Sequence, residues 1–178
     1  VEKIQLNWYP GHMAKTKNEV KKIMPLIDVV FELIDARIPY SSKMRDIDDI
    51  IKNKFRVLVM TKKDLCDISV TNKWINYYEN LGYKVVLTNL SSGDDYKDVL
   101  NATSEVINKI NDIRKEKGLK PKEIKALVMG VPNVGKSTFI NKLAHKKVAS
   151  TGNKPGVTKS NTWLKTKYNM VILDTPGV

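Results

Sequence analysis

The sequence predicts an α/β fold built on a mostly parallel six-stranded sheet with helices on both faces. Two observations lead to this prediction. Apolar runs rich in β-branched residues alternate with segments of helical period, which is typical of parallel βα units. One of these runs also leads through a glycine-rich loop, residues 130–137, into a helical segment. At 178 residues the chain is long enough for one such domain and too short for two large ones.

Four apolar runs predict the parallel strands, and two shorter runs predict a hairpin that turns near Tyr168 and Asn169. The parallel strands are expected at Val29–Ala36, Phe55–Thr61, Lys84–Asn89 and Lys125–Val131, and the hairpin at Thr162–Lys167 and Met170–Asp174. Apolar side chains at helical spacing predict helices over roughly Lys15–Ile27, Met44–Lys52, Val70–Asn80, Tyr96–Lys117 and Ser137–His145. A lysine-rich connector, Glu116–Glu123, leads from the fourth helix to the next strand.

The net charge of +12 indicates attraction to a polyanion, either nucleic acid or an anionic membrane. Charge alone does not separate a nucleic-acid surface from an ordinary solvated one. No stretch approaches the roughly 18 consecutive apolar residues of a membrane span, and no basic segment carries an apolar membrane face. The only cysteine, Cys66, cannot form an internal disulfide, and the N-terminus shows no secretory pattern. We therefore expect a cytoplasmic protein that does not bind membranes.

The segment from Gly130 to Ser137 (GVPNVGKS) fits G-x-x-x-x-G-K-[ST], the pattern of a phosphate-binding loop. Its two outer glycines let the backbone curl so that N–H groups face the phosphates at the positive end of the next helix. Lys136 is expected to reach the β- and γ-phosphates, and the Ser137 hydroxyl to bind Mg²⁺. The residues predicted to hold phosphate are Gly130, Pro132, Asn133, Val134, Gly135, Lys136, Ser137, Thr138 and Gly177.

Two further segments complete the predicted Mg²⁺ site. Asp174 ends the last apolar run, where a carboxylate can hold the ion through water, and Gly177 frees a backbone N–H to approach the γ-phosphate. Thr158 lies in a Gly/Pro-rich loop, Gly152–Lys159, and its hydroxyl would complete the Mg²⁺ shell when the γ-phosphate is present. The alternative is that Thr158 is an ordinary turn residue. The predicted Mg²⁺ ligands are thus Ser137, Thr158 and Asp174.

The segment Thr61–Asp64 (TKKD) follows an apolar strand and resembles the [NT]-K-x-D motif that selects guanine in GTPases. The Asp64 carboxylate would accept hydrogen bonds from the guanine N1–H and 2-amino group, and adenine offers neither. The Lys62 stem would pack over the base. A loop after the next strand would offer a backbone amide to the guanine O6, although Leu90 departs from the usual small residue. The residues predicted to bind guanine are Thr61, Lys62, Asp64, Asn89, Leu90 and Ser91.

The order of these motifs is rotated relative to conventional small GTPases, in which the phosphate loop comes first. Together with Trp8–Lys15 (WYPGHMAK) and Asp35–Pro39 (DARIP), the rotated order closely resembles the RbgA/YlqF family of circularly permuted P-loop GTPases. The resemblance implies a nucleotide-dependent switch that binds GTP and GDP and assembles the large ribosomal subunit. The implied partners are the rRNA and ribosomal proteins of a pre-ribosomal particle, which would stimulate hydrolysis. Nothing demands more than a monomer.

The resemblance spans the whole chain, which we interpret as one GTPase domain, residues 1–178, with an N-terminal arm of about residues 1–14. Family members continue past the Asp174–Gly177 segment into a helical, RNA-contacting C-terminal domain. That domain is absent from these 178 residues.

The conventional motif does not supply the residue that orients the attacking water. Conventional GTPases orient the attacking water with a Gln where this chain has Val178. The resemblance points instead to His12; alternatively, His12 anchors the N-terminal arm or touches RNA. Asn133 resembles the Asn of potassium-activated GTPases, which implies a K⁺ site, unless Asn133 only tolerates the turn. Arg37 stays open between a structural ion pair and an RNA contact.

Two other functions are weighed against this reading. A small-molecule P-loop kinase would need arginines in a lid over the phosphates. The four arginines, Arg37, Arg45, Arg56 and Arg114, form no such cluster, and TKKD favours guanine. A GTPase that acts on transfer RNA or on membranes stays a third possibility.

Overall fold

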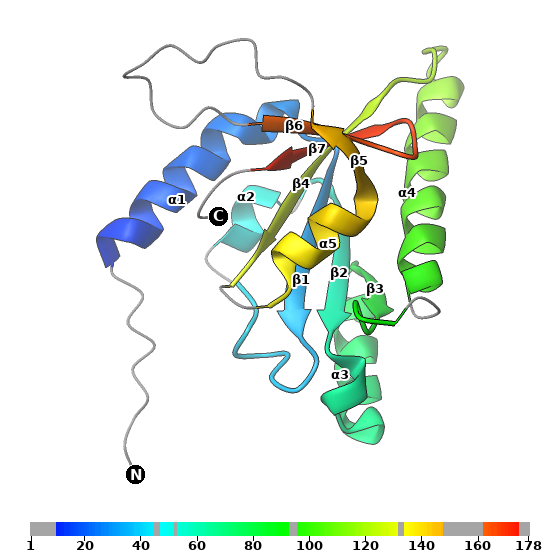
Figure 1. Ribbon diagram of the computed structural model, residues 1–178. Coiled ribbons are helices and arrows are strands. Elements are labelled where there is room, and N and C mark those ends of the chain that lie inside the picture. The colour runs from blue at the N-terminus through cyan, green and yellow to red at the C-terminus, as the bar shows by residue number, and fades with distance from the viewer. Residues whose placement is uncertain are drawn as a thin grey trace.

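A seven-stranded sheet runs through the part of the chain that the computed structural model describes (Figure 1). The strand order is β3-β2-β1-β4-β7-β6-β5. The strands are β1 (Val29–Asp35), β2 (Phe55–Thr61), β3 (Lys84–Leu87), β4 (Ile124–Gly130), β5 (Ala144–Lys147), β6 (Thr162–Thr166) and β7 (Met170–Asp174). The structure describes residues 10–44, 47–51, 53–92, 96–131, 134–147 and 162–174, and only the backbone of residues 10–16, 145–147, 162 and 174.

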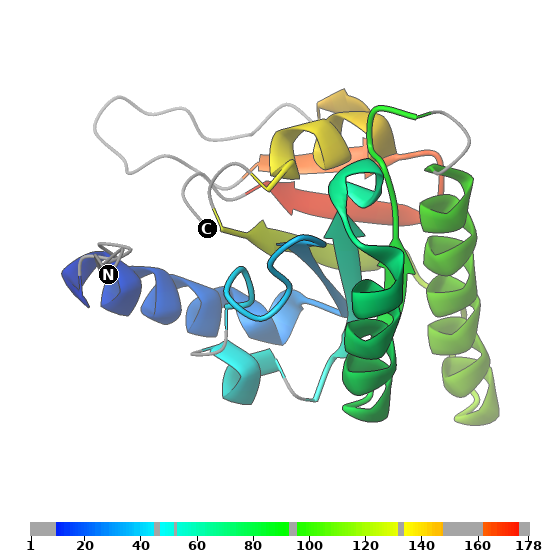
Figure 2. The same cartoon turned by 90° about the horizontal axis from the view of Figure 1, so that it is seen from below.

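Helices cover both faces of this sheet (Figure 2). They are α1 (Pro10–Ile23), α2 (Asp48–Ile51), α3 (Ile68–Asn80), α4 (Tyr96–Glu116) and α5 (Lys136–Leu143). Helices α4 and α5 share one apolar cluster with the sheet, whereas α1, α2 and α3 pack on the opposite face. Within the described ranges, every helix is too short or too polar to cross a membrane.

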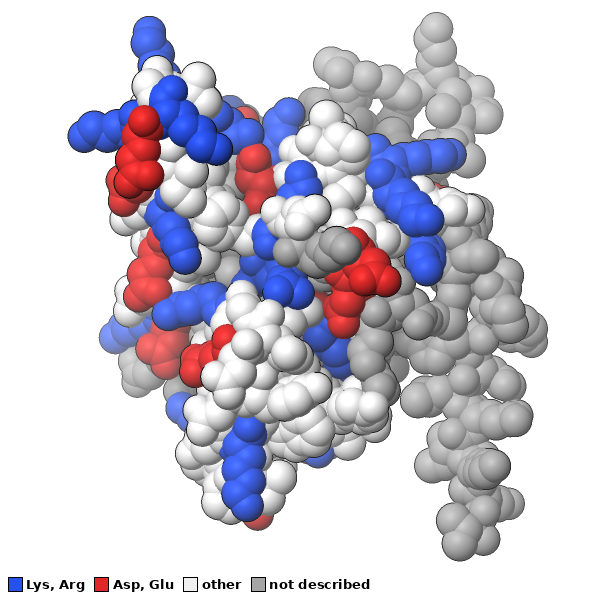
Figure 3. Space-filling model, turned by 180° about the vertical axis from the view of Figure 1, so that it is seen from behind, with Lys and Arg blue, Asp and Glu red and all other residues white. Residues whose placement is uncertain are grey.

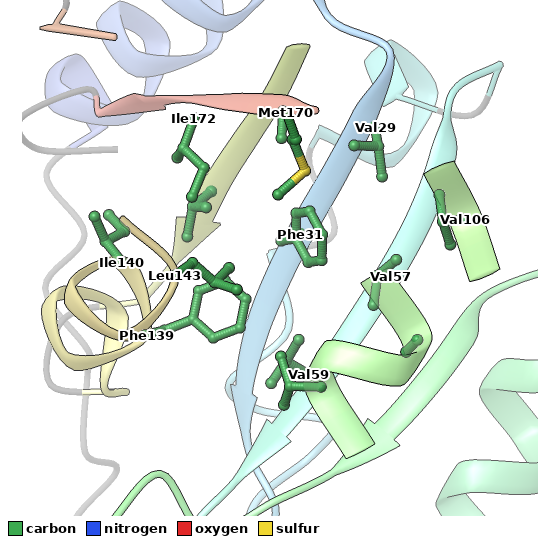
Figure 4. Close-up of a cluster of buried hydrophobic side chains, with 14 of the residues drawn as sticks. Val29, Phe31, Val57, Val59, Val106, Phe139, Ile140, Leu143, Met170 and Ile172 are labelled. Atoms are coloured by element: carbon green, nitrogen blue, oxygen red, sulfur yellow. The ribbon is translucent and has the colours of Figure 1, made fainter. Parts of the chain in front are cut away.

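The central strand β1 shows why the apolar runs form buried strands. All seven of its residues are buried, because β1 lies between β2 and β4 and is covered on both faces. Phe31 points toward the α4 and α5 cluster and its ring lies 5.6 Å from that of Phe139 (Figure 4). Val30 and Ile34 point to the other face, as the two-residue period of a strand requires.

The predicted α/β class and the mostly parallel sheet are confirmed. Strands β3, β2, β1, β4 and β7 are parallel, and β6 and β7 form the expected antiparallel hairpin. The sheet has one strand more than predicted. Helix α5 ends at Leu143 instead of His145, and Ala144–Lys147 pairs with β6 as strand β5. This pairing gives hydrogen-bond partners to an edge of β6 that would otherwise be unpaired.

Helices α1 and α2 depart furthest from their predicted bounds. Helix α1 begins at Pro10, so the backbone of residues 10–14, expected in the arm, is helical. Its last turn becomes a 3₁₀ turn at Met24–Leu26, because Pro25 has no N–H to continue an α-helix. Helix α2 covers only Asp48–Ile51 of the predicted segment 44–52, and the Met44 backbone N–H instead donates to Glu32 Oε1 at 3.1 Å.

A buried ion-pair network lies on the face covered by α1, α2 and α3, between the two apolar clusters there. Glu32 stands in the middle of β1, and its Oε2 lies 3.0 Å from Lys43 Nζ; both side chains are at most 2% exposed. Lys43 Nζ also lies 2.6 Å from Asp48 Oδ1, to which the Tyr83 hydroxyl donates at 3.1 Å. Burial raises the pKa of the Glu32 carboxyl, and the positive charge of Lys43 offsets only part of that rise. The network ties loop 36–44 to the sheet.

Candidate functional site

The carboxyl ends of the parallel strands form the edge of the sheet at which the predicted motifs gather (Figure 1). The register places Asp35 at the end of β1 beside Thr61 at the end of β2. It also places Leu33 of β1 beside Gly130, the last residue of β4. Strand β7, which ends at Asp174, is paired with the other side of β4. In open parallel sheets, ligands bind at this carboxyl edge, where neighbouring strands lead their chains apart.

The predicted phosphate loop leads from β4 into the N-terminus of α5. Gly135 caps this helix with a φ of 106°, a left-handed conformation that a residue with a side chain rarely adopts. The first turn of α5 carries no acidic residue that would offset the partial positive charge at the helix N-terminus. Ser137 and Thr138 are exposed in this turn. The geometry suits a bound phosphate, although Pro132 and Asn133 lie outside the described residues.

Gly130 is needed for close packing, not for an unusual backbone. A Cβ atom at this position would lie 2.9 Å from the Leu33 carbonyl oxygen and 2.9 Å from Val134 Cγ1. The first of these neighbours belongs to the central strand β1, which cannot shift without disturbing the sheet. Any side chain at Gly130 would therefore push the phosphate loop away from β1.

We expect Gly130→Ala to lower the free energy of unfolding by about 2–3 kcal/mol, as overpacking does in a rigid interior. Gly118→Ala is the matched control, because nothing lies within 4 Å of a Cβ there and only its φ of +71° opposes a side chain. It should cost about 1 kcal/mol. Urea unfolding of both variants measures the difference. Equal costs would show that the contact with β1 does not select glycine.

Thr61, the first residue of TKKD, connects the predicted base segment to the phosphate loop. Its hydroxyl donates to the Val134 carbonyl at 2.8 Å and lies 3.2 Å from the Ile34 carbonyl. The side chain is buried, so the bond is shielded from water. Two motifs separated by 73 positions are thus joined directly.

The next residues of TKKD hold a strained backbone. Lys62 adopts a left-handed conformation, with φ 61° and ψ 40°, the one non-glycine residue of the described chain with positive φ. The Lys63 backbone N–H donates to the Thr88 carbonyl at 3.2 Å, which fixes the segment against the end of β3. Asp64 then lies exposed in a 3₁₀ turn, Lys63–Leu65. Non-glycine residues in this backbone region cluster at functional sites.

The loop after β3 packs against the phosphate loop through Leu90. This side chain is buried, and a Cβ atom at Gly135 would lie 3.1 Å from its Cδ1 atom. The departure from a small residue at Leu90 therefore fills the space between the two loops. Asn89 shapes the turn, because its Oδ1 accepts from Ser91 N at 3.0 Å and its carbonyl accepts from Ser92 N at 3.0 Å.

Asp35 is a site residue that the sequence analysis did not single out. Its carboxylate accepts from Arg37 Nε and Nη2 at 3.0 and 2.7 Å, and from Lys62 Nζ at 3.1 Å. Burial alone would raise the pKa of Asp35, but the hydrogen bonds from Arg37 and Lys62 outweigh it and lower the pKa to about 2. Arg37 therefore makes the structural ion pair that was one of its two predicted roles. The sequence signal that could have identified Asp35 was an acidic residue at the end of a buried strand, two positions before the basic residue Arg37.

Other predicted site residues are only partly covered by the structure. The backbone of Asp174 ends β7, and that of His12 lies in the first turn of α1, but neither side chain is described. Thr158 and Gly177 fall outside the described residues. No group of three or more His, Cys, Asp or Glu side chains that would hold a metal is found in the ranges that the structure covers. Ser137 is the predicted Mg²⁺ ligand whose side chain can be placed.

Comparison with known proteins gives this arrangement a family. A family model described as a 50S ribosome-binding GTPase matches residues 125–178. Ribosome biogenesis GTPase A of Bacillus licheniformis is 46% identical over 97% of this chain and 61% of its own length. The crystal structure of GNP-bound YlqF from T. maritima matches 91% of this chain and 57% of that chain, with a TM-score of 0.64 and 28% identity. The chain is similar to the RbgA/YlqF family along nearly its whole length.

More distant RbgA/YlqF relatives match over the same span. Ribosome biogenesis GTPase A of Thermotoga maritima is 33% identical over 97% of this chain and 59% of its own length. Mitochondrial ribosome-associated GTPase 1 of Bos taurus is 34% identical over 96% of this chain and 53% of its own length. The chain therefore spans between half and two thirds of the length of these relatives. The motif order along the chain, with TKKD before the phosphate loop, is the rotated order of the RbgA/YlqF family.

Proposed function

We propose that the chain is the GTP-binding and GTP-hydrolysing domain of an assembly factor for the large ribosomal subunit, acting as a nucleotide-dependent switch on pre-ribosomal particles. The observation that carries the nucleotide part is the bond from Thr61 to the Val134 carbonyl. It fixes a segment with the chemistry to read guanine against a loop with the chemistry to hold phosphate. One nucleotide spanning both would explain why the two are joined.

In this proposal, three loops of the described chain bind the nucleotide. The Asp64 carboxylate accepts from the guanine N1–H and 2-amino group, while the loop at Asn89–Ser91 offers a backbone N–H to O6. The N–H groups from Gly135 onward and the Lys136 ammonium hold the phosphates. An ATP would leave the Asp64 carboxylate without its donors, so the site favours GTP and GDP.

The oxygen ligands near the phosphates fit Mg²⁺, which prefers few protein ligands together with phosphate oxygens and water. The exposed Ser137 hydroxyl would hold the ion, with Asp174 and Thr158 completing its shell. Bound Mg²⁺ neutralises negative charge that develops on the phosphates during hydrolysis. Asn133, which resembles the Asn of potassium-activated GTPases, would hold a K⁺ ion near the same phosphates.

Hydrolysis needs a group that orients the attacking water, and we assign this role to His12. Near physiological pH a histidine imidazole can be neutral, and it then accepts a hydrogen bond from the attacking water. Helix α1 begins at Pro10, so His12 belongs to a helical turn and not to an irregular arm.

Ribosomal particles are the proposed partner for two reasons. Relatives at 33–46% identity are named for ribosome biogenesis, and the matched family model is described as 50S ribosome-binding. The net charge of +12 agrees with rRNA as the polyanion. On the face shown in Figure 3, Lys and Arg side chains are interspersed with Asp and Glu. We place the protein in the cytoplasm as a monomer, with no part bound to membranes.

The test is GTP hydrolysis by the full-length protein, in KCl and in NaCl, with and without large-subunit particles. We expect slow hydrolysis by the protein alone and stimulation of at least about tenfold by the particles. A tenfold stimulation lowers the activation free energy by roughly 1.4 kcal/mol. His12→Ala should remove the stimulation, whereas His145→Ala, the same change at the other histidine, should keep it. A stronger response to transfer RNA or to liposomes than to particles would contradict the proposed partner. Stimulation that survives in His12→Ala would overturn the assigned base.

A further inference from the structure

We propose that Asp35 is a positioning residue for guanine recognition, acting on the base segment, residues 61–64, through Lys62. The inference rests on the proposed function, because it assumes that residues 61–64 read guanine. Asp35 lies at the end of β1, outside the base segment, and no predicted contact to nucleotide involves it. Its influence would pass through the side chain that it holds.

The Asp35 carboxylate is buried and receives several hydrogen bonds. Its side chain is 7% exposed, and its two oxygens receive bonds from the Arg37 backbone N–H at 2.9 Å, from the Arg37 guanidinium, and from Lys62 Nζ at 3.1 Å. A carboxylate that is bonded on both oxygens keeps one orientation. The Lys62 ammonium, 31% exposed, is therefore drawn toward β1 by a fixed anchor.

The base segment depends on such anchors because its backbone is strained. Lys62 has left-handed dihedral angles, which a residue with a Cβ atom holds only when the surroundings impose them. Thr61 is fixed on one side by the Val134 carbonyl, and Lys63 on the other by the Thr88 carbonyl. The bond to Asp35 adds a side-chain restraint on the strained residue between them.

This restraint affects guanine binding because it acts on both the side chain and the backbone of Lys62. Its ammonium is held at Asp35, so its aliphatic stem is restrained at both ends, and a guanine base would stack on this restrained stem. Asp64 follows two residues later, and the direction of its carboxylate depends on the backbone at Lys62. Releasing the ammonium frees both the stem and the strained backbone.

A simpler role for Asp35 would be to pair with Arg37 alone. Arg37 is 45% exposed, and its Nη2 makes the shortest hydrogen bond that the Asp35 carboxylate receives, at 2.7 Å. If this pair were the whole role, Arg37→Gln would reproduce every effect of Asp35→Asn. The proposal predicts instead that Arg37→Gln leaves most of the nucleotide affinity, because Lys62 still meets the carboxylate.

The experiment measures the Kd for GDP and for inosine diphosphate, which lacks the 2-amino group, and the Tm of each full-length variant. Asp35→Asn should weaken GDP binding about tenfold, the loss expected for one charge-assisted hydrogen bond. It should also reduce the preference for GDP over inosine diphosphate. The pair Asp35→Asn and Lys62→Met should be non-additive, so that the double variant binds GDP no more weakly than Lys62→Met alone. Glu105→Gln, which removes an exposed carboxylate paired with Lys84, is the matched control and should bind as wild type.

Several outcomes would overturn the proposal. Wild-type affinity in Asp35→Asn would do so, as would losses from Asp35→Asn and Lys62→Met that multiply in the double variant. Equal losses in Arg37→Gln and Asp35→Asn would reduce Asp35 to a partner of Arg37. A lower Tm with unchanged preference for GDP would assign Asp35 a structural role only. Failure of wild type to bind GDP would contradict the proposed function itself, and is thereby distinguishable from failure of the Asp35 proposal.

Discussion

Lys43→Met is expected to lower the free energy of unfolding by about 3–5 kcal/mol, because it leaves a buried carboxylate without its cation. Lys43 Nζ lies 3.0 Å from Glu32 Oε2 and 2.6 Å from Asp48 Oδ1, and the Lys43 and Glu32 side chains are both nearly inaccessible to water. Glu32 has only the Met44 backbone N–H as a further described partner. Urea unfolding at neutral pH measures the loss.

Two variants test whether this cost comes from the buried charge. Lys84→Met removes an exposed pair with Glu105, whose side chains are 46% and 63% exposed, and should cost less than about 1 kcal/mol. A double variant, Glu32→Met with Lys43→Met, should recover much of the loss because no charge stays buried. If Lys43→Met were as mild as Lys84→Met, the network would not stabilise loop 36–44 as the structure indicates.

Asp64→Asn is expected to weaken GDP binding about a hundredfold or more. Two hydrogen bonds to a charged carboxylate are lost or weakened, each contributing about 1.5–3 kcal/mol. The amide that replaces the carboxylate can donate a hydrogen bond, so it should favour xanthosine diphosphate, which has a carbonyl in place of the 2-amino group. Isothermal titration with both nucleotides gives the change in preference.

Asp67→Asn is the matched control for Asp64→Asn, because it makes the same change three residues later. Asp67 caps α3 by accepting from Ser69 N and Val70 N, and Asn caps helices about as well as Asp. Its affinity for GDP should therefore equal that of wild type. A similar loss in both variants, or no gain for xanthosine diphosphate in Asp64→Asn, would mean that Asp64 does not read the base.

The sequence predicted what local patterns determine. Strand Phe55–Thr61 has its predicted bounds, since a continuous apolar run with polar segments on both sides leaves few other choices. The turn at Gly135 in the predicted phosphate loop was also predictable, because a left-handed helix cap is a local requirement. The glycine at Gly130 answers to a tertiary contact with β1. The family resemblance, which rests on the combination of motifs, is confirmed by relatives at 33–46% identity.

Tertiary contacts determine the features that the sequence did not reveal. Nothing local pairs Glu32, inside an apolar run, with Lys43 on the loop that follows. The bond between Lys62 and the Asp35 carboxylate also requires β1 and β2 to lie side by side, because Asp35 ends one strand and Lys62 follows the other. Strand β5 looked like the end of a helix, because the pairing that makes it a strand comes from β6, across a segment outside the described residues.

Equilibrium binding of GDP and ADP, each with Mg²⁺, tests most directly the claim that the two motifs form one guanine-nucleotide site. We expect GDP to bind and ADP to bind at least about a thousandfold more weakly, because adenine leaves the Asp64 carboxylate unpaired. Lys136→Ala should weaken GDP binding in the same assay, since it removes the charge that meets the phosphates. Equal affinity for the two nucleotides would contradict the claim, because the phosphate loop alone would then account for binding.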